Sequence, residues 1–183
     1  MRTEFEARFL EIDPSKITEY LTSQSAVCAM PRTLMRRIVF KNNYIEARGG
    51  WLRLRQQGER TFLTYKQVTS NVSAIDTTLE AEVEVGNFDS TKTLLEAMGF
   101  TALRYQENYR EEWKLNSVAF DIDTWPDLPT FLEVEGPDEN SVHKAAAALG
   151  LDVTQASYGT VDEVYLAVLG RDILAESELV FTA

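Results

Sequence analysis

Apolar and polar residues alternate along most of this chain, and a period of two indicates half-buried β-strands. Side chains two positions apart on a strand share a face, so each alternating segment has one apolar and one polar face. The alternation predicts eight strands, over residues 2–12, 34–40, 50–56, 61–67, 78–85, 103–115, 117–123 and 130–136. Short breaks around Gly58 and at Asn116-Ser117 are typical of hairpins between neighbouring strands.

Helical segments are fewer than strands. Asp13 is placed to cap a helix with Pro14 at its first position, and this helix is expected to run to about Val27. Further helices are predicted from Asp89 or Ser90 to Gly99, over residues 139–149 and over residues 161–169. No repeat or linker divides the 183 residues, which predicts one α+β domain with a closed or nearly closed sheet. Its core would span about residues 2–136 and its C-terminal helices about residues 138–175.

Charged residues occupy the polar faces of most predicted strands. The rows are Glu4, Glu6 and Arg8; Arg53 and Arg55; Thr64 and Lys66; Glu80, Glu82 and Glu84; Arg110 and Glu112; Asp121 and Asp123; and Glu133 and Glu135. A sheet with one face in water explains any single row. However, Asp, Glu and Lys are depleted in strands, and like charges repel unless cations lie between them. A closed barrel with a charged interior accounts for all the rows together.

A charged interior of this kind suits polyphosphate chemistry. Carboxylates bind hard cations such as Mg²⁺ and Mn²⁺ through oxygen. Arginine and lysine bind phosphate oxygens, arginine often with two hydrogen bonds at once. The rows therefore predict a site for a polyphosphate ligand and divalent cations.

Overall charge and composition narrow the function further. The net charge of −11 disfavours binding to nucleic acids and anionic membranes, which prefer basic surfaces. No apolar run approaches the roughly 20 residues that span a bilayer. Glu4 and Glu6 lie where a signal peptide needs a basic start and an apolar stretch, which predicts a cytoplasmic protein. The chain has one cysteine, Cys28, and one histidine, His143, which argues against disulfides, thiolate metal clusters and Ser-His or Cys-His catalysis.

The ordered motifs resemble those of the CYTH, or triphosphate tunnel metalloenzyme, superfamily. Residues 4–8 (EFEAR) resemble the ExExK signature, and residues 131–136 (FLEVEG) resemble the FxExEG strand. Between them, residues 35–40 (MRRIVF), 50–55 (GWLRLR), 63–66 (LTYK), 79–85 (LEAEVEV) and 109–123 (YREEWKLNSVAFDID) resemble further family strands in the same order. Two departures stand out: Arg8 replaces the usual lysine, and Asn108 lies where relatives often have a basic residue, for which Arg104 is a possible substitute.

The resemblance implies an α+β fold with an eight-stranded antiparallel β barrel and flanking helices. It implies a metal-dependent enzyme with Mg²⁺ or Mn²⁺ that hydrolyses inorganic, thiamine or nucleoside triphosphate, or cyclises ATP to cyclic AMP as a class IV adenylate cyclase. A non-catalytic triphosphate or nucleotide sensor is the alternative, and a homodimer is the expected assembly. By position, the expected metal ligands are Glu4, Glu6, Asp123, Glu133 and Glu135. The expected phosphate ligands are Arg8, Arg37, Arg53, Arg55, Lys66 and Arg110, and the expected catalytic residues are Glu82, Glu84 and Arg8.

Overall fold

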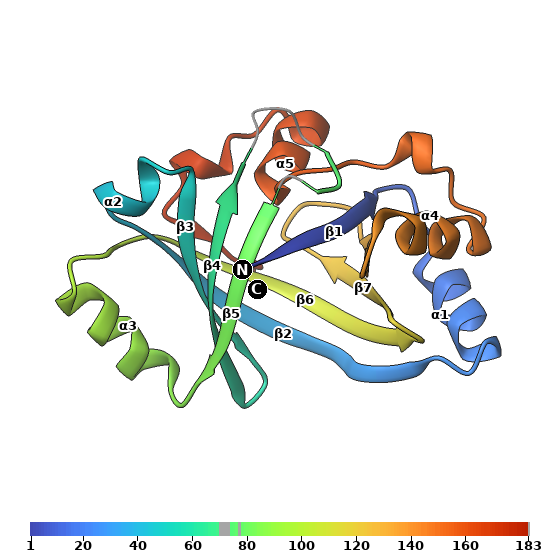
Figure 1. Ribbon diagram of the computed structural model, residues 1–183, viewed down its shortest axis with the longest axis horizontal. Helices are drawn as coiled ribbons and strands as arrows, with labels where there is room; N and C mark the ends of the chain where they lie inside the picture. The colour runs from blue at the N-terminus through green and yellow to red at the C-terminus, as the bar shows by residue number, and fades with distance from the viewer. Residues whose placement is uncertain (70–73, 77, 183) are drawn as a thin grey trace.

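A single sheet organises the molecule. The computed structural model describes residues 1–69, 74–76 and 78–182. Its strands are β1 (Arg2–Phe9), β2 (Val27–Lys41), β3 (Gly50–Gln57), β4 (Arg60–Val68), β5 (Thr78–Val85), β6 (Thr101–Leu115), β7 (Val118–Thr124), β8 (Phe131–Gly136) and β9 (Glu178–Leu179). Neighbours follow the order β2-β3-β4-β5-β1-β8-β7-β6, and β2 also pairs with β6, which closes the barrel. The predicted eight-stranded antiparallel barrel is confirmed, and β9 adds a short parallel pairing to β6 (Figure 1).

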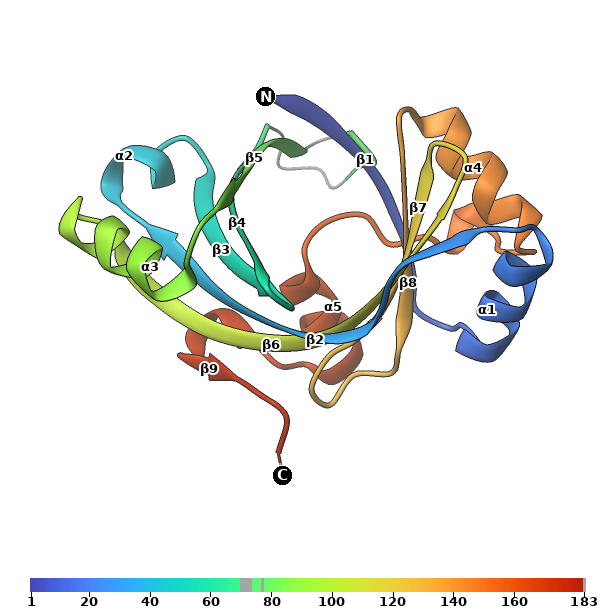
Figure 2. The same ribbon diagram turned by 90° about the horizontal axis from the view of Figure 1, so that it is seen from below.

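Helices cover the barrel on two opposite sides (Figure 2). The helices are α1 (Pro14–Ser23), α2 (Asn43–Glu46), α3 (Phe88–Ala97), α4 (Glu139–Ala148) and α5 (Val161–Leu169), with single 3-10 turns at Val153–Gln155 and Ile173–Ala175. α1 and α4 lie beside β7 and β8, whereas α2 and α3 lie on the far side. Among the described residues, no helix is both long and apolar enough to cross a membrane.

The apolar strand faces point outward and pack against these helices. Ala7, Phe120 and Val134, from β1, β7 and β8, form one core cluster with Leu21 of α1 and Val142 of α4. A second cluster joins β2 and β3 to α3. Because the outer faces are used for packing, the alternate, charged positions turn into the barrel. The helices thus bury the apolar residues and leave the polar faces lining the interior.

A third cluster lines part of the barrel interior. It joins α5 and the segment after it to Trp125 and Phe131. Phe131 lies two residues before Glu133 on β8, so the two share the inner face. α5 therefore supplies an apolar boundary to an otherwise charged interior.

Local signals explain most element boundaries. The Asp13 carboxylate accepts from the backbone N–H groups of Ser15 and Lys16, at 3.0 and 3.4 Å, so the predicted helix cap is confirmed. The hairpin predicted around Gly58 joins β3 to β4, and Gly58 has a φ of +58°. Asn116, at φ +56°, turns β6 into β7, which confirms the second predicted hairpin.

The prediction was wrong at the ends of several elements. α1 ends at Ser23, not near Val27, and β1 ends at Phe9, not at residue 12. β2 begins at Val27 and is twice the predicted length, because it pairs along nearly all of β6. Pro31, which has no N–H to donate, falls within the register shift between Met30 and Thr33 of that ladder. The irregular pairing there accommodates a residue that cannot donate a ladder hydrogen bond.

Candidate functional site

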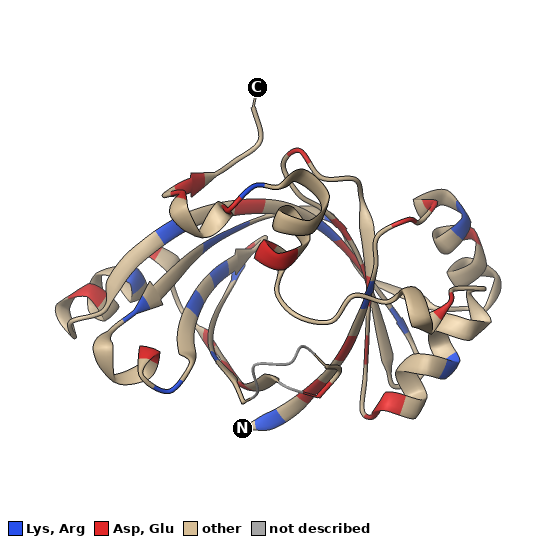
Figure 3. Cartoon of the chain, turned by 90° about the horizontal axis from the view of Figure 1, so that it is seen from above, with Lys and Arg blue, Asp and Glu red and all other residues tan. Residues whose placement is uncertain are grey.

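The barrel encloses a cavity of about 890 Å³ lined by charged side chains from β1 to β8. Alternation on each strand turns these residues inward, as predicted. Twelve of the thirteen predicted site residues line this cavity, namely Glu4, Glu6, Arg8, Arg37, Arg53, Arg55, Lys66, Glu82, Arg110, Asp123, Glu133 and Glu135. Acidic positions mark β1, and basic positions mark a strand across the barrel from it (Figure 3). The interior therefore has two walls of opposite charge.

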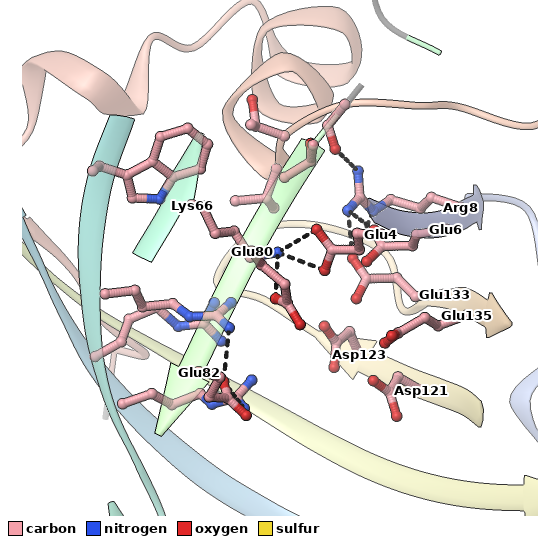
Figure 4. A pocket seen from close by; sticks show the side chains of 18 of the residues that line it. Glu4, Glu6, Arg8, Lys66, Glu80, Glu82, Asp121, Asp123, Glu133 and Glu135 are labelled. Atoms are coloured by element: carbon pink, nitrogen blue, oxygen red, sulfur yellow. Dashed lines mark hydrogen bonds and ion pairs between the residues drawn. The ribbon is translucent and has the colours of Figure 1, made fainter. Parts of the chain in front are cut away.

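The acidic wall consists of six carboxylates on β1, β7 and β8: Glu4, Glu6, Asp121, Asp123, Glu133 and Glu135. They gather on one side of the cavity, with Glu82 apart from them (Figure 4). Glu6 lies directly opposite Glu135, and Asp121 lies opposite Glu133. Like charges paired across strands destabilise a sheet unless a cation compensates them.

Two arginines, the buried Arg8 and the largely buried Arg110, provide part of that compensation. Arg8, 4% exposed, donates to Glu133 at 2.5 and 2.9 Å, to Glu6 at 3.0 Å and to the Gly159 carbonyl at 3.1 Å. Arg110 donates to Asp123 at 2.6 and 2.7 Å and to Glu133 at 2.5 Å, and it also bonds Asp121. Both guanidinium groups are thus committed to carboxylates.

Negative charge remains in excess on the acidic wall. Burial and the nearby Glu133 raise the pKa of Glu6, and burial raises the pKa of Asp121 to about 7. Burial acts on Glu133 in the same sense, but Arg8 and Arg110 outweigh it and lower the pKa of that carboxyl. Asp121 Oδ1 is buried and finds no hydrogen-bond partner among the described residues. These carboxylates therefore favour uptake of positive charge.

The basic wall consists of Arg37 on β2 with Arg53 and Arg55 on β3. Each of the three has a buried Nε for which the described residues offer no acceptor. Arg37 lies opposite Arg55 across the strand pair, stacks over the Trp125 ring at 4.6 Å and bonds the Asn108 side chain. Burial and the mutual repulsion of the arginines lower the pKa of Arg37, and burial together with Arg53 and Arg110 lowers that of Arg55 to about 10. The basic wall therefore carries more positive charge than the nearby carboxylates compensate.

Glu82 is the carboxylate that lies among these arginines. It accepts a hydrogen bond from Thr64 at 2.7 Å, and it lies 3.4 Å from Arg55 and 3.6 Å from Arg53. One carboxylate shared by two arginines leaves the wall with a positive excess. Guanidinium groups with free N–H donors in a buried setting are typical of phosphate recognition.

A second ion-pair network lies beside the acidic wall and includes residues that the sequence prediction missed. Lys66 donates to both Glu4 oxygens, at 2.7 and 2.8 Å, and lies 3.7 Å from Glu80. Arg2 donates to Glu80 at 2.6 Å. Glu80 shares the strand face of Glu82, and Arg2 that of Glu4, so the same alternation identifies both. Lys66 is therefore occupied by carboxylates, as Arg8 and Arg110 are.

Three more predictions can be compared with the structure. Glu84, predicted to be catalytic, does not line the cavity: its half-exposed carboxylate pairs with Arg60 at 2.7 Å near the end of β5. Asp121, in the same row as Asp123, was missed as a site residue although it lines the cavity. Arg104 also lines the cavity, and it donates to the Leu174 carbonyl at 3.1 Å.

The acidic wall is chemically suited to a hard divalent cation such as Mg²⁺ or Mn²⁺. Its donors are carboxylate oxygens, its charge is in excess, and one buried Asp121 oxygen has no hydrogen-bond partner in the described part of the chain. Within the described residues, no three such side chains already converge as a ready-made metal site. A cation would therefore bind only after some of the internal ion pairs rearrange.

Comparisons with known proteins agree with this architecture. A family model, the CYTH domain, matches residues 32–173. A proposed adenylate cyclase from Vibrio parahaemolyticus superposes with a TM-score of 0.75 at 12% identity, covering 89% of this chain and 97% of that one. A Pyrococcus horikoshii protein gives 0.70 at 19% identity, over 86% and 96% of the two chains. A proposed adenylyl cyclase from Hippeastrum, described as having a dominant triphosphatase activity, gives 0.60 at 15% identity, over 93% and 97%. A comparison with curated proteins found no match. At these identities the structural likeness concerns the fold alone.

Proposed function

This chain belongs to the CYTH domain family, and from that premise we propose that it hydrolyses a triphosphate-bearing substrate with the help of a divalent cation. One observation carries the proposal: a single cavity has a wall of arginines with unpaired N–H donors and a facing wall of carboxylates with excess negative charge. A substrate polyanion satisfies the first wall and a cation the second. We also propose that the barrel and its C-terminal helices form one domain over residues 1–183.

Arg37, Arg53 and Arg55 form the phosphate clamp in this proposal. Their unpaired Nε donors provide hydrogen bonds that a phosphate oxygen can accept without breaking another pair. Phosphoryl transfer depends on positioning and charge stabilisation more than on covalent chemistry, and a rigid cationic wall supplies both. Arg8, Lys66 and Arg110 were also expected to bind phosphate, but their donors are engaged by carboxylates. Their contribution would be to hold the acidic wall together.

The carboxylates Glu4, Glu6, Asp121, Asp123, Glu133 and Glu135 are the proposed cation ligands. When bound, a divalent cation held by these carboxylates would supply neutralisation of phosphate charge and activation of a water molecule. Glu82 stands between Arg53 and Arg55, next to any phosphoryl group that these arginines hold. We propose that Glu82 orients the attacking water. Hydrolysis requires only this water as the second reactant, whereas cyclisation of ATP also requires a ribose hydroxyl held in line with the α-phosphorus.

Product analysis tests the proposal. The purified protein is incubated with tripolyphosphate, thiamine triphosphate or ATP, each with Mg²⁺, with Mn²⁺ or with a chelator. We expect orthophosphate release that requires the cation and is lost in Arg53→Ala and Glu4→Ala. Arg60→Ala is the matched control, because Arg60 pairs with Glu84 outside the cavity.

Two other outcomes would replace the proposal. Cyclic AMP together with pyrophosphate would identify an adenylate cyclase. Tripolyphosphate that raises the melting temperature, with no product from any substrate, would identify a non-catalytic binding protein.

A further inference from the structure

Arg110 occupies the centre of the acidic wall. Its guanidinium contacts three carboxylates from two other strands: Asp121 and Asp123 on β7 and Glu133 on β8. The Arg110 side chain is 14% exposed, and its three partners are 11%, 1% and 10% exposed. One cation shared by three nearly buried carboxylates fills the electrostatic role that a divalent cation would have there.

The charges around Arg110 do not balance. Glu6 joins the three carboxylates through Arg8, so four acidic groups share two guanidinium groups. Counted as fully ionised, the four carboxylates leave an excess of two negative charges, which one divalent cation would neutralise. Arg110 consumes the oxygens that such a cation needs, and its own charge repels that cation. Arg110 and a cation are therefore competitors for the same carboxylates.

Arg110 also lies close enough to the basic wall to influence it. Its positive charge lowers the pKa of both Arg37 and Arg55. If the Arg110 guanidinium leaves the carboxylates, it would enter the region of the basic wall, where the buried Nε donors have no acceptor among the described residues. Its release would add a fourth cation to the phosphate clamp.

We propose that Arg110 is an internal counter-cation, bound to Asp121, Asp123 and Glu133 until a divalent cation displaces it. This inference rests on the proposed function, since it requires cation binding at the acidic wall. This role differs from that of a static salt bridge in the direction in which removal of Arg110 changes the affinity for the cation. Removal of a competitor strengthens cation binding, whereas removal of a residue that merely orients the ligands weakens it.

Measurement of Mn²⁺ affinity without substrate tests the direction of this change. Mn²⁺ affinity is measured by electron paramagnetic resonance of the free ion for the wild type, Arg110→Gln and Arg110→Lys. We expect about tenfold tighter Mn²⁺ binding in Arg110→Gln, within the usual range of coupling between ligands. Lysine keeps the charge but cannot span three carboxylates, so Arg110→Lys should show a smaller gain and provides the test if the glutamine variant does not fold. Arg36→Gln is the matched control, because Arg36 does not line the cavity and bonds Gln56.

Thermal unfolding gives a second readout. Mn²⁺ should raise the melting temperature more in Arg110→Gln than in the wild type, because the metal-free variant has lost the counter-cation. Unchanged or weaker Mn²⁺ binding in both Arg110 variants would overturn this inference and leave the proposed function intact. If neither the wild type nor Arg110→Gln binds Mn²⁺, the metal-dependent function fails as well.

Discussion

Replacement of Arg55 by methionine should stabilise the protein while it weakens phosphate binding. Arg55 lies in the basic wall, directly opposite Arg37, and its side chain is 11% exposed. Burial and the neighbouring arginines destabilise the charged form of Arg55, and the attraction of Glu82 offsets only part of this effect. Methionine has a similar reach and no charge, so it removes the repulsion and adds an apolar side chain to a buried position.

The structure provides the magnitude. Burial and the neighbouring arginines lower the pKa of Arg55 from its usual value to about 10, and each unit of pKa corresponds to about 1.4 kcal/mol. A folded-state pKa below the unfolded value means that the charged form destabilises the fold, and near neutral pH this cost is fully present. It amounts to about 3 kcal/mol. This figure already contains the attraction of Glu82, which acts on the same pKa. The free energy of unfolding should therefore rise by about 3 kcal/mol.

Urea and thermal unfolding without phosphate or metal measure this effect. For a chain of this length the melting temperature should rise by about 6 to 12 °C. Calorimetry with tripolyphosphate should show weaker binding by the same variant. Arg60→Met is the control, since Arg60 is exposed outside the cavity and its replacement should leave both quantities unchanged. A less stable Arg55→Met protein would show that the basic wall is not under electrostatic strain and would refute the reasoning.

Three further predictions concern the acidic wall, the barrel end and a close contact. Glu133→Gln leaves two arginines without a shared acceptor, so the free energy of unfolding should fall by about 3 to 5 kcal/mol in urea titrations; a loss below about 1 kcal/mol would contradict the assigned ion pairs. Glu84→Ala should release phosphate at the wild-type rate, because Glu84 lies outside the cavity, and a large loss of rate would restore its catalytic role. Gly50→Ala should lower stability by about 1 to 3 kcal/mol, because its Cβ would lie 2.5 to 2.9 Å from the Tyr65 ring and hydroxyl; an unchanged melting temperature would mean that this ring moves freely.

The sequence was informative wherever a repeating local signal existed. Alternation identified all eight barrel strands and the inward face of each, because side-chain direction on a strand follows position alone. It also contained the signal for Glu80 and Asp121, which share rows with Glu82 and Asp123 and line the cavity. Asp13 marked the start of α1 because a cap depends on adjacent residues.

The ends of elements followed longer-range pairing. The predicted strand began at residue 34, yet β2 begins at Val27 and continues through Pro31, because β6 offers a long partner and the irregular register absorbs the proline. Glu84 belongs to the acidic row of β5, but near the end of that strand it pairs with Arg60 and does not line the cavity. Neither outcome is encoded in the residues next to these positions.

Alternation along the chain was enough to predict the charged rows and the barrel that they line. The pairing of the cations with the carboxylates inside the barrel depended on tertiary contacts. Arg8 and Arg110 on one side, and Arg53 and Arg55 on the other, look alike as inward arginines on strands. Strand order brings the first pair against the carboxylates of β7 and β8, and it brings the second pair against another arginine. The partner of a buried charge depends on which strands become neighbours, and that is settled when the barrel closes.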